Sequence, residues 1–250
     1  MRSALQAAVK RFRSTLLKTR PSPPSYTSLR PDLPILDLPP ANPHHALDRI
    51  VAGNRVYAQQ TAQEDPNAFV ELSKGQAPEI LWIGCADSRI PETTVCHCKP
   101  GELFVHRNIA NVVHADDVNA ASVVEYAVTH LKVKKVVVCG HTKCGGANAA
   151  LVDTDLGETL NTWLHPVREL RRKHKAELAK LPDDDARAVR VAELNVNQSL
   201  DVLKLHPAIK KAVNERGLTL HGMIYDIAAG QLRLLEETGQ KKSTGLWAPS

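Results

Sequence analysis

The sequence of 250 residues contains few aromatic side chains and no long apolar run. Only 4% of its residues are aromatic, although 43% are hydrophobic and 24% are charged. No stretch approaches the roughly eighteen consecutive apolar residues of a membrane-spanning helix, so we expect no membrane partner. The ordinary charged and apolar fractions exclude collagen-like, mucin-like and wholly disordered chains. The length suits one large domain or, at most, two small ones.

Cysteine is also scarce, and its positions are uneven. The five cysteines are at positions 85, 96, 98, 139 and 144. This number is too small for a disulfide scaffold in a chain of this length. In a reducing compartment such residues are typical metal ligands or core thiols. We interpret Cys139, which lies on a predicted buried strand, as a core thiol.

Acidic residues are absent from residues 1–31, which contain seven basic ones: Arg2, Lys10, Arg11, Arg13, Lys18, Arg20 and Arg30. The rest of the chain therefore holds 25 basic against 27 acidic residues, although the whole chain has a net charge of +5. The isoelectric point near 9.0 thus reflects this first segment and not a basic binding face. We expect no nucleic-acid partner.

The basic segment has the pattern of a mitochondrial transit peptide. Leu5, Val9, Phe12 and Leu16 recur every three or four residues and predict one apolar stripe on a basic helix. Prolines at 21, 23, 24, 31 and 34 then favour an extended linker. We assign 1–41 to a transit peptide and Pro-rich linker, 42–238 to the folded domain and 239–250 to a C-terminal tail. The expected location is the mitochondrial matrix, with a cytoplasmic protein carrying a basic tail as the alternative.

From Asn42 onward, helical and strand patterns alternate. Asn42-Pro43 predicts a helix start that continues to about Gln63, and Asp116-Asp117 predicts another that continues to about Leu131. Strands are predicted at 79–85, 102–106, 135–139, 218–225 and 232–235, and helices across 145–180 and 186–213. Near-continuous apolar strands separated by helices predict an α/β fold with a mostly parallel central sheet flanked by helices.

Metal-binding residue types follow two of the predicted strands. Cys85 ends the first strand, while His141 and Cys144 follow the strand at 135–139. Because parallel strands end at one edge of a sheet, we expect these three side chains to converge. Two thiolates and an imidazole suit Zn²⁺, and three protein ligands leave one position open, as in catalytic zinc sites. Taken singly, each residue could instead be a core thiol or a loop histidine.

The sequence resembles the β-class carbonic anhydrases over nearly all of 42–235. The resemblance rests on Leu-Trp-Ile-Gly-Cys-Ala-Asp-Ser-Arg (81–89), Pro-Gly-Glu-Leu-Phe-Val-His-Arg-Asn-Ile-Ala-Asn (100–111), Cys-Gly-His-Thr-Lys-Cys-Gly-Gly (139–146) and His-Gly-Met-Ile-Tyr-Asp (221–226). It implies one zinc ion per chain on Cys85, His141 and Cys144, and reversible hydration of CO₂ to bicarbonate. It also implies a homodimer or tetramer in which an N-terminal helical arm lies across the neighbouring subunit.

The resemblance further implies a dyad of Asp87 and Arg89 beside the metal. Two thiolates already cancel the charge of zinc, so we expect Asp87 to orient the attacking water and Arg89 to hold Asp87 ionised by a two-pronged pair. In a closed state of the family, Asp87 becomes the fourth zinc ligand. An ordinary ion pair that caps a loop is the alternative interpretation. We also assign contacts with the substrate to Ile90, Gly145 and Gly146.

Three other residues correspond to a non-catalytic bicarbonate pocket of one subgroup of the family: Trp82, Arg107 and Tyr225. A guanidinium offers forked donors to a planar oxyanion, and the two aromatic side chains can each add a hydrogen bond. Bicarbonate in such a pocket would favour the closed state. Alternatively, the aromatic residues are core, and Arg107 pairs with a carboxylate such as Glu102.

Cys96-His97-Cys98 departs from the usual family pattern. On a strand the two cysteines would face the same side, which would allow a second metal or redox site. Paired core thiols beside a surface histidine are the alternative. We interpret five further histidines as solvated surface residues: His114, His130, His165, His174 and His206.

The same residues are compatible with two other functions. A COS or CS₂ hydrolase of the same fold would keep the zinc site and change the access channel. A weakly active bicarbonate-sensing or assembly protein would keep the site closed through Asp87. Intact Asp87 and Arg89 argue against simple loss of activity.

Overall fold

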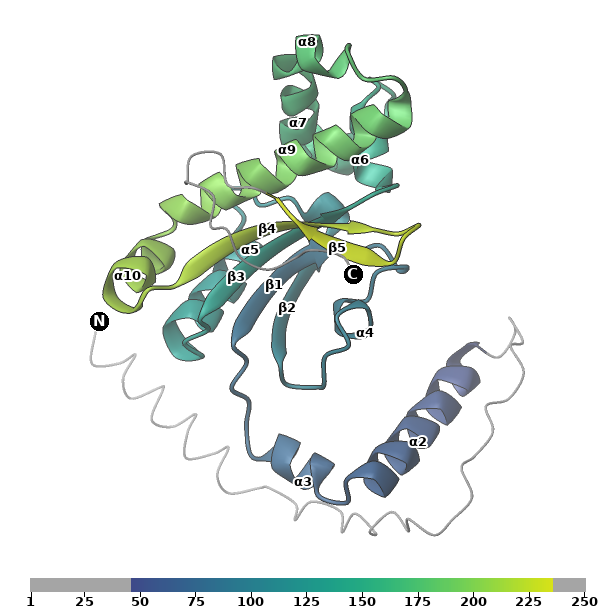
Figure 1. The fold of residues 1–250 in the computed structure, drawn as a ribbon, viewed down its shortest axis with the longest axis vertical. Coiled ribbons are helices and arrows are strands. Elements are labelled where there is room, and N and C mark those ends of the chain that lie inside the picture. The colour runs from purple at the N-terminus through teal and green to yellow at the C-terminus, as the bar shows by residue number, and fades with distance from the viewer. Residues whose placement is uncertain (1–45, 236–250) are drawn as a thin grey trace, which may run out of the picture. The chain divides into compact units, whose positions relative to one another are not determined.

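The computed structural model describes residues 46–235, and the chain divides into two units at Gly75 (Figure 1). The predicted transit peptide and linker (1–41), the helix start at Asn42-Pro43 and the C-terminal tail (239–250) lie outside the described residues. None of the helices in 46–235 is long and apolar enough to cross a membrane.

The described part of the first unit consists of two helices, α2 (Ala46–Glu64) and α3 (Ala68–Ser73). The predicted helix end near Gln63 is confirmed. The rings of Tyr57 and Phe69 meet edge to face at 5.9 Å and join the two helices. This unit exposes an unusual number of large apolar side chains: Leu47, Ile50, Val51, Tyr57, Phe69, Val70 and Leu72.

The second unit is built on a five-stranded sheet. Its strands are β1 (Ile80–Cys85), β2 (Leu103–Asn108), β3 (Lys135–His141), β4 (Thr219–Asp226) and β5 (Gln231–Leu234). The order is β2-β1-β3-β4-β5; the first four strands are parallel, and β5 runs antiparallel to β4. The predicted mostly parallel sheet flanked by helices is confirmed.

The helices of this unit are α4 (Glu92–Val95), η2 (Ile109–Asn111), α5 (Val118–Glu125) with the π-turn η3 (Tyr126–His130), α6 (Gly145–Ala150), α7 (Glu158–Lys173), α8 (Lys175–Leu178), α9 (Asp184–Leu205) and α10 (Pro207–Arg216). The helical stretches predicted across 145–180 and 186–213 are therefore interrupted. Gly157 has a φ of 88°, which no helix accommodates, and it separates α6 from α7. Pro207 has no N–H to continue α9, so α10 begins there.

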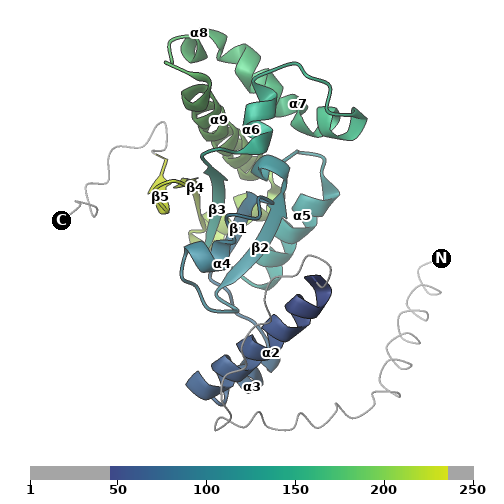
Figure 2. The same cartoon turned by 90° about the vertical axis from the view of Figure 1, so that its right-hand side faces the viewer.

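The two faces of the sheet are covered unequally. One face packs into the main core with α5, α9 and α10, and it is lined by Leu81, Ile83, Val136, Val138 and Ile224. The opposite face carries a small cluster of Trp82, Val137 and Cys139, and Cys96 packs against it just after α4. In Figure 2, α5 and α4 accordingly lie on opposite sides of β1 and β2.

Helix α9 lies unusually close to the centre of the sheet. A Cβ on Gly140 of β3 or on Gly222 of β4 would lie 3.0 Å from a methyl group of Val196. Glycine at both positions therefore lets the helix approach, which fixes α9 over the two strands that lead to the site.

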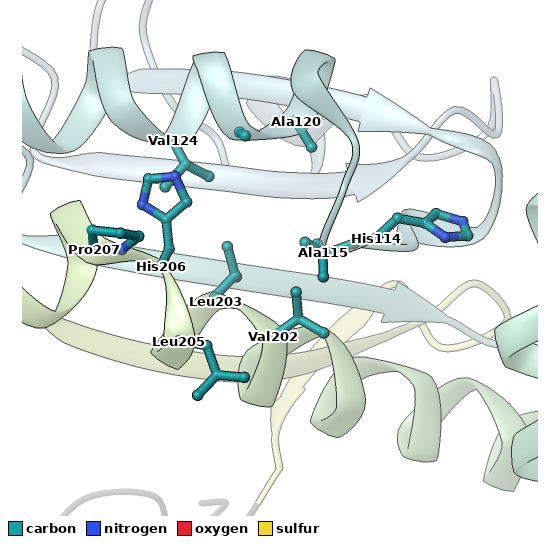
Figure 3. A pocket seen from close by; sticks show the side chains of 11 residues that line it. His114, Ala115, Ala120, Val124, Val202, Leu203, Leu205, His206 and Pro207 are labelled. Atoms are coloured by element: carbon teal, nitrogen blue, oxygen red, sulfur yellow. The ribbon is translucent and has the colours of Figure 1, made fainter.

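A cavity of about 160 Å³ lies between α5 and the junction of α9 with α10 (Figure 3). Its lining is mostly aliphatic, with His114 and His206 as its two imidazoles. None of the site residues predicted from the sequence lines it. The site is therefore at a different place, at the carboxyl ends of the parallel strands.

Candidate metal centre

The structure brings Cys85, His141 and Cys144 together. Their donor atoms all lie within 4.8 Å of one another, and all three residues are buried. Cys85 ends β1 and His141 ends the neighbouring strand β3, while Cys144 is the N-cap residue of α6. The predicted convergence at one edge of the sheet therefore occurs.

The imidazole of His141 is prepared to act as a ligand. Its Nδ1 lies 2.9 Å from the carbonyl oxygen of Thr142, which favours the tautomer with the proton on Nδ1. Its Nε2 is buried and has no hydrogen-bond partner among the described residues. A buried nitrogen lone pair between two thiols is costly unless it binds something. This arrangement fits a soft metal ion such as zinc.

The two buried thiols affect each other's protonation. A hydrogen bond from the Cys144 thiol, together with the nearby His141 ring, lowers the pKa of Cys85. The same contact with Cys85, together with burial, raises the pKa of Cys144. Binding of a metal ion by this pair requires both thiols to be deprotonated, so the metal affinity should increase with pH.

Asp87 is held beside the three ligands by Arg89. The guanidinium donates from Nε to Oδ1 at 3.0 Å and from Nη2 to Oδ2 at 2.7 Å, and the Arg89 backbone N–H adds a third bond at 2.9 Å. These hydrogen bonds hold the pKa of Asp87 well below its usual range. Oδ2 of Asp87 lies 4.0 Å from Nε2 of His141. The carboxylate is therefore ionised, oriented by Arg89 and adjacent to the cluster.

Arg107 binds the loop that carries these residues. Its Nε donates to the carbonyl oxygen of Cys85 at 2.9 Å, and its Nη2 donates to that of Asp87 at 2.6 Å. Its Nη1 pairs at 3.6 Å with Glu92, and this corrects the suggested partner Glu102. The sequence alone does not identify Glu92 as this partner. Arg107 thus fixes the backbone between a ligand and the dyad.

The bicarbonate pocket suggested for Trp82, Arg107 and Tyr225 stays a prediction. The Trp82 indole covers Gly84, where an added Cβ would lie 2.7 Å from its Nε1. Tyr225 is half-buried and packs against the same cluster as Trp82. In this conformation two donors of Arg107 are committed to backbone carbonyls, so an anion would have to compete with them.

The residues assigned to substrate contacts lie around the cluster. Ile90 is buried, and it follows the dyad. A side chain on Gly145 would meet no atom within 4 Å, so the space in front of it is open. A Cβ on Gly146, in contrast, would lie 2.7 Å from that of Ala110. Gly145 therefore leaves room beside Cys144, whereas Gly146 permits close packing.

The strand geometry considered for Cys96 and Cys98 is wrong. Cys96 is the C-cap of the short helix α4, and His97 has a φ of 53°, so the segment is a turn. Burial raises the pKa of Cys96 to about 11 and also raises that of Cys98, which disfavours reactive thiolates. Within residues 46–235, no second group of three metal-binding side chains accompanies the Cys85 cluster.

Three of the five histidines assigned to solvated surface are half-buried with partners. The ring of His114 contacts the carbonyl oxygen and the indole of Trp163, that of His174 pairs with Glu177, and that of His206 caps α10. Only tertiary contacts reveal these roles. The other two, His130 and His165, are exposed as expected.

The fold and this donor set define an α/β protein with a soft, three-residue metal site at the edge of its sheet. The sequence profile of the family described as carbonic anhydrase matches residues 80–232. A carbonic anhydrase of Emericella nidulans is 44% identical over 187 residues, which cover 74% of this chain and 82% of that protein. One of Candida albicans is 40% identical over 192 residues, which cover 76% and 68% respectively.

Solved structures agree with these relatives. A tetrameric β-carbonic anhydrase from Sordaria macrospora has a TM-score of 0.75 at 47% identity, covering 76% of this chain and 97% of that one. The β-carbonic anhydrase CafA of Aspergillus fumigatus has a TM-score of 0.74 at 50% identity, covering 76% and 90%. The chain belongs to the β-class carbonic anhydrases and resembles the fungal type; the general reaction of the family is the hydration of CO₂.

Proposed function

We propose that this chain catalyses the zinc-dependent, reversible hydration of CO₂ to bicarbonate and a proton. The observation that carries the proposal is the buried Nε2 of His141, which has no hydrogen-bond partner within residues 46–235 and lies with two thiols beside the carboxylate that Arg89 holds. Cys85, His141 and Cys144 would hold the ion. Zinc in such a site supplies Lewis acidity and a strong nucleophile derived from water near neutral pH.

The dyad orients the reacting groups. Asp87 is ionised and accepts hydrogen bonds, so it can fix the direction of the attacking water. Arg89 keeps the carboxylate in place through two parallel donors, and its Nη2 also binds the carbonyl oxygen of Lys143, next to a ligand. Ile90 provides an apolar wall, and the open space before Gly145 suits a small linear molecule such as CO₂.

Stopped-flow CO₂ hydration across about pH 6 to 9 tests this function. We expect kcat/KM to rise with pH, because the nucleophile is deprotonated water. The low pKa of Asp87 keeps the dyad ionised throughout this range, so its titration does not produce the rise. Hydration that is absent from the zinc-loaded chain at every pH would contradict the proposal.

A parallel assay with COS and CS₂ separates the alternatives. Hydrolysis of these compounds without CO₂ hydration would identify the chain as a sulfur-compound hydrolase. If it turned over neither substrate but bound bicarbonate, a sensing role with Asp87 on the metal would be supported instead.

We also propose a homo-oligomer, a dimer or a tetramer. The support is the exposed apolar surface of α2 and α3, which isolated soluble helices rarely carry, and the tetramer described for the Sordaria macrospora relative. Light scattering should give a mass at least twice that of one 27.4 kDa chain.

We propose the mitochondrial matrix as the location, with the cytoplasm as the alternative. The acid-free segment 1–31 supports this proposal. A reporter fused to residues 1–40 that stays in the cytosol would rule out import.

A further inference from the structure

The turn η2, which follows β2, has a strained backbone. Ala110 and Asn111 have φ values of 60° and 48°, in the left-handed region that residues other than glycine rarely adopt. The Nδ2 of Asn111 is buried and lacks a partner among the described residues, so its amide N–H groups donate no hydrogen bond within the turn. Groups outside the turn must therefore hold it.

Three side chains from two other helices bind the three successive carbonyl oxygens of this turn. Trp163 of α7 donates its Nε1–H to the first at 2.8 Å. Asn195 of α9 donates from Nδ2 to the second at 2.8 Å. Ser199, one helical turn further along α9, donates its hydroxyl to the third at 3.4 Å and accepts the N–H of Val113 at 3.3 Å. No carbonyl in the turn lacks a donor from a side chain.

Asn195 and Ser199 interrupt an otherwise apolar helix face. They are 3% and 1% exposed, and their buried neighbours on α9 are Ala188, Val191, Ala192, Leu194, Val196, Leu200 and Leu203. A buried amide or hydroxyl without a partner is costly, so the polar groups of helix and turn satisfy one another. Because α9 is fixed over β3 and β4, it offers a rigid support for the turn.

The turn lies between the two segments that carry the thiol ligands. On one side, the residue that precedes it, Asn108, pairs with Cys85 in the sheet. On the other side, the Cβ of Ala110 reaches within 2.7 Å of the Cβ position of Gly146, two residues after Cys144. Because these segments are in close contact, the turn cannot move independently of them, and a displaced turn would shift both thiols.

We propose that Asn195 and Ser199 are positioning residues of the metal centre: they hold the left-handed turn and thereby set the separation of the Cys85 and Cys144 thiols. The hydrogen bonds of both residues go to backbone groups of the turn and of Val113, so both would act on the ligands through the backbone. The inference deepens the proposed function, since it concerns the site that would bind zinc, but it predicts metal affinity independently of any reaction.

Asn195→Leu removes the donor at similar volume and is the main test. We expect the zinc affinity, measured by competition with a chromophoric chelator, to fall about 10- to 100-fold, as is common when groups that orient metal ligands are lost. The visible spectrum of the Co²⁺-substituted protein should change as the ligand geometry loosens. Ser199→Ala should change the zinc affinity and the Co²⁺ spectrum in the same direction but by a smaller amount. It replaces Asn195→Leu as the test if that variant does not fold.

Two further variants separate positioning from general destabilisation. Ile209→Ala shortens a buried side chain of the same core on a different helix, α10, so it should lower the thermal stability with wild-type zinc affinity. Asn111→Gly in the Asn195→Leu background eases the left-handed conformation and should restore most of the affinity.

Wild-type zinc affinity and Co²⁺ spectrum in Asn195→Leu would overturn the proposal, as would an equal loss of affinity in Ile209→Ala. Because the readout is metal binding, a chain that binds zinc but hydrates no CO₂ would overturn the proposed function without altering the result for Asn195.

Discussion

Replacing Cys144 by serine should remove nearly all zinc from the protein. We expect the zinc content to fall from one ion per chain to below about one-tenth of an ion per chain after dialysis, because the affinity for zinc depends on a complete set of deprotonated ligands. A serine hydroxyl does not ionise at neutral pH and is a poor ligand for a soft site. CO₂ hydration should be lost together with the metal.

Cys96→Ser is the matched control for this experiment. Cys96 is a half-buried thiol outside the cluster, so its replacement should leave the zinc content at one per chain. Metal analysis by mass spectrometry measures both variants. Full zinc retention in Cys144→Ser would contradict the assignment of Cys144 as a zinc ligand. Loss of zinc in Cys96→Ser would indicate a metal site at the turn after α4.

Replacing Asp87 by alanine should abolish most activity and leave the zinc in place. The three ligands do not depend on this carboxylate, whereas the direction of the attacking water does. We expect kcat/KM to fall by at least about 100-fold, comparable to the loss of a preorganised hydrogen-bonding group in other active sites. Stopped-flow hydration, combined with metal analysis of the same sample, measures the effect.

Arg89→Ala tests whether Arg89 acts by orienting the Asp87 carboxylate or by keeping it ionised. Without the guanidinium, the pKa of Asp87 should return toward the ordinary value of about 3.9 and the carboxylate should remain charged at neutral pH. Any loss of activity near pH 7 therefore reports lost orientation. Asp185→Ala is a matched control, because Asp185 also pairs with a cation, Lys143, but is exposed. Near-normal turnover in both dyad variants would show that the pair only shapes the loop.

Strands and helix starts that depend on neighbouring residues can be predicted from the sequence. The run Val136–Val138 predicts a buried strand because such residues fit a sheet covered on both sides, and Asp117 caps α5 by accepting the N–H of Asn119. Helix propensities do not predict the break between α6 and α7, because this break depends on the positive φ of Gly157, which the local sequence does not specify. The turn at Cys96 to Cys98 was missed for the same reason.

The donor set of the metal centre can be predicted from residue types and spacing, because Cys85, His141 and Cys144 follow strands whose parallel pairing brings their ends together. The contacts that hold this donor set depend instead on long-range packing. The pairing of Arg107 with Glu92 and the support of the η2 turn by Asn195 and Ser199 join residues from separate elements. The physical reason is that burial makes each of these polar groups require a partner, and the packing of α9 on the sheet determines which partner is within reach.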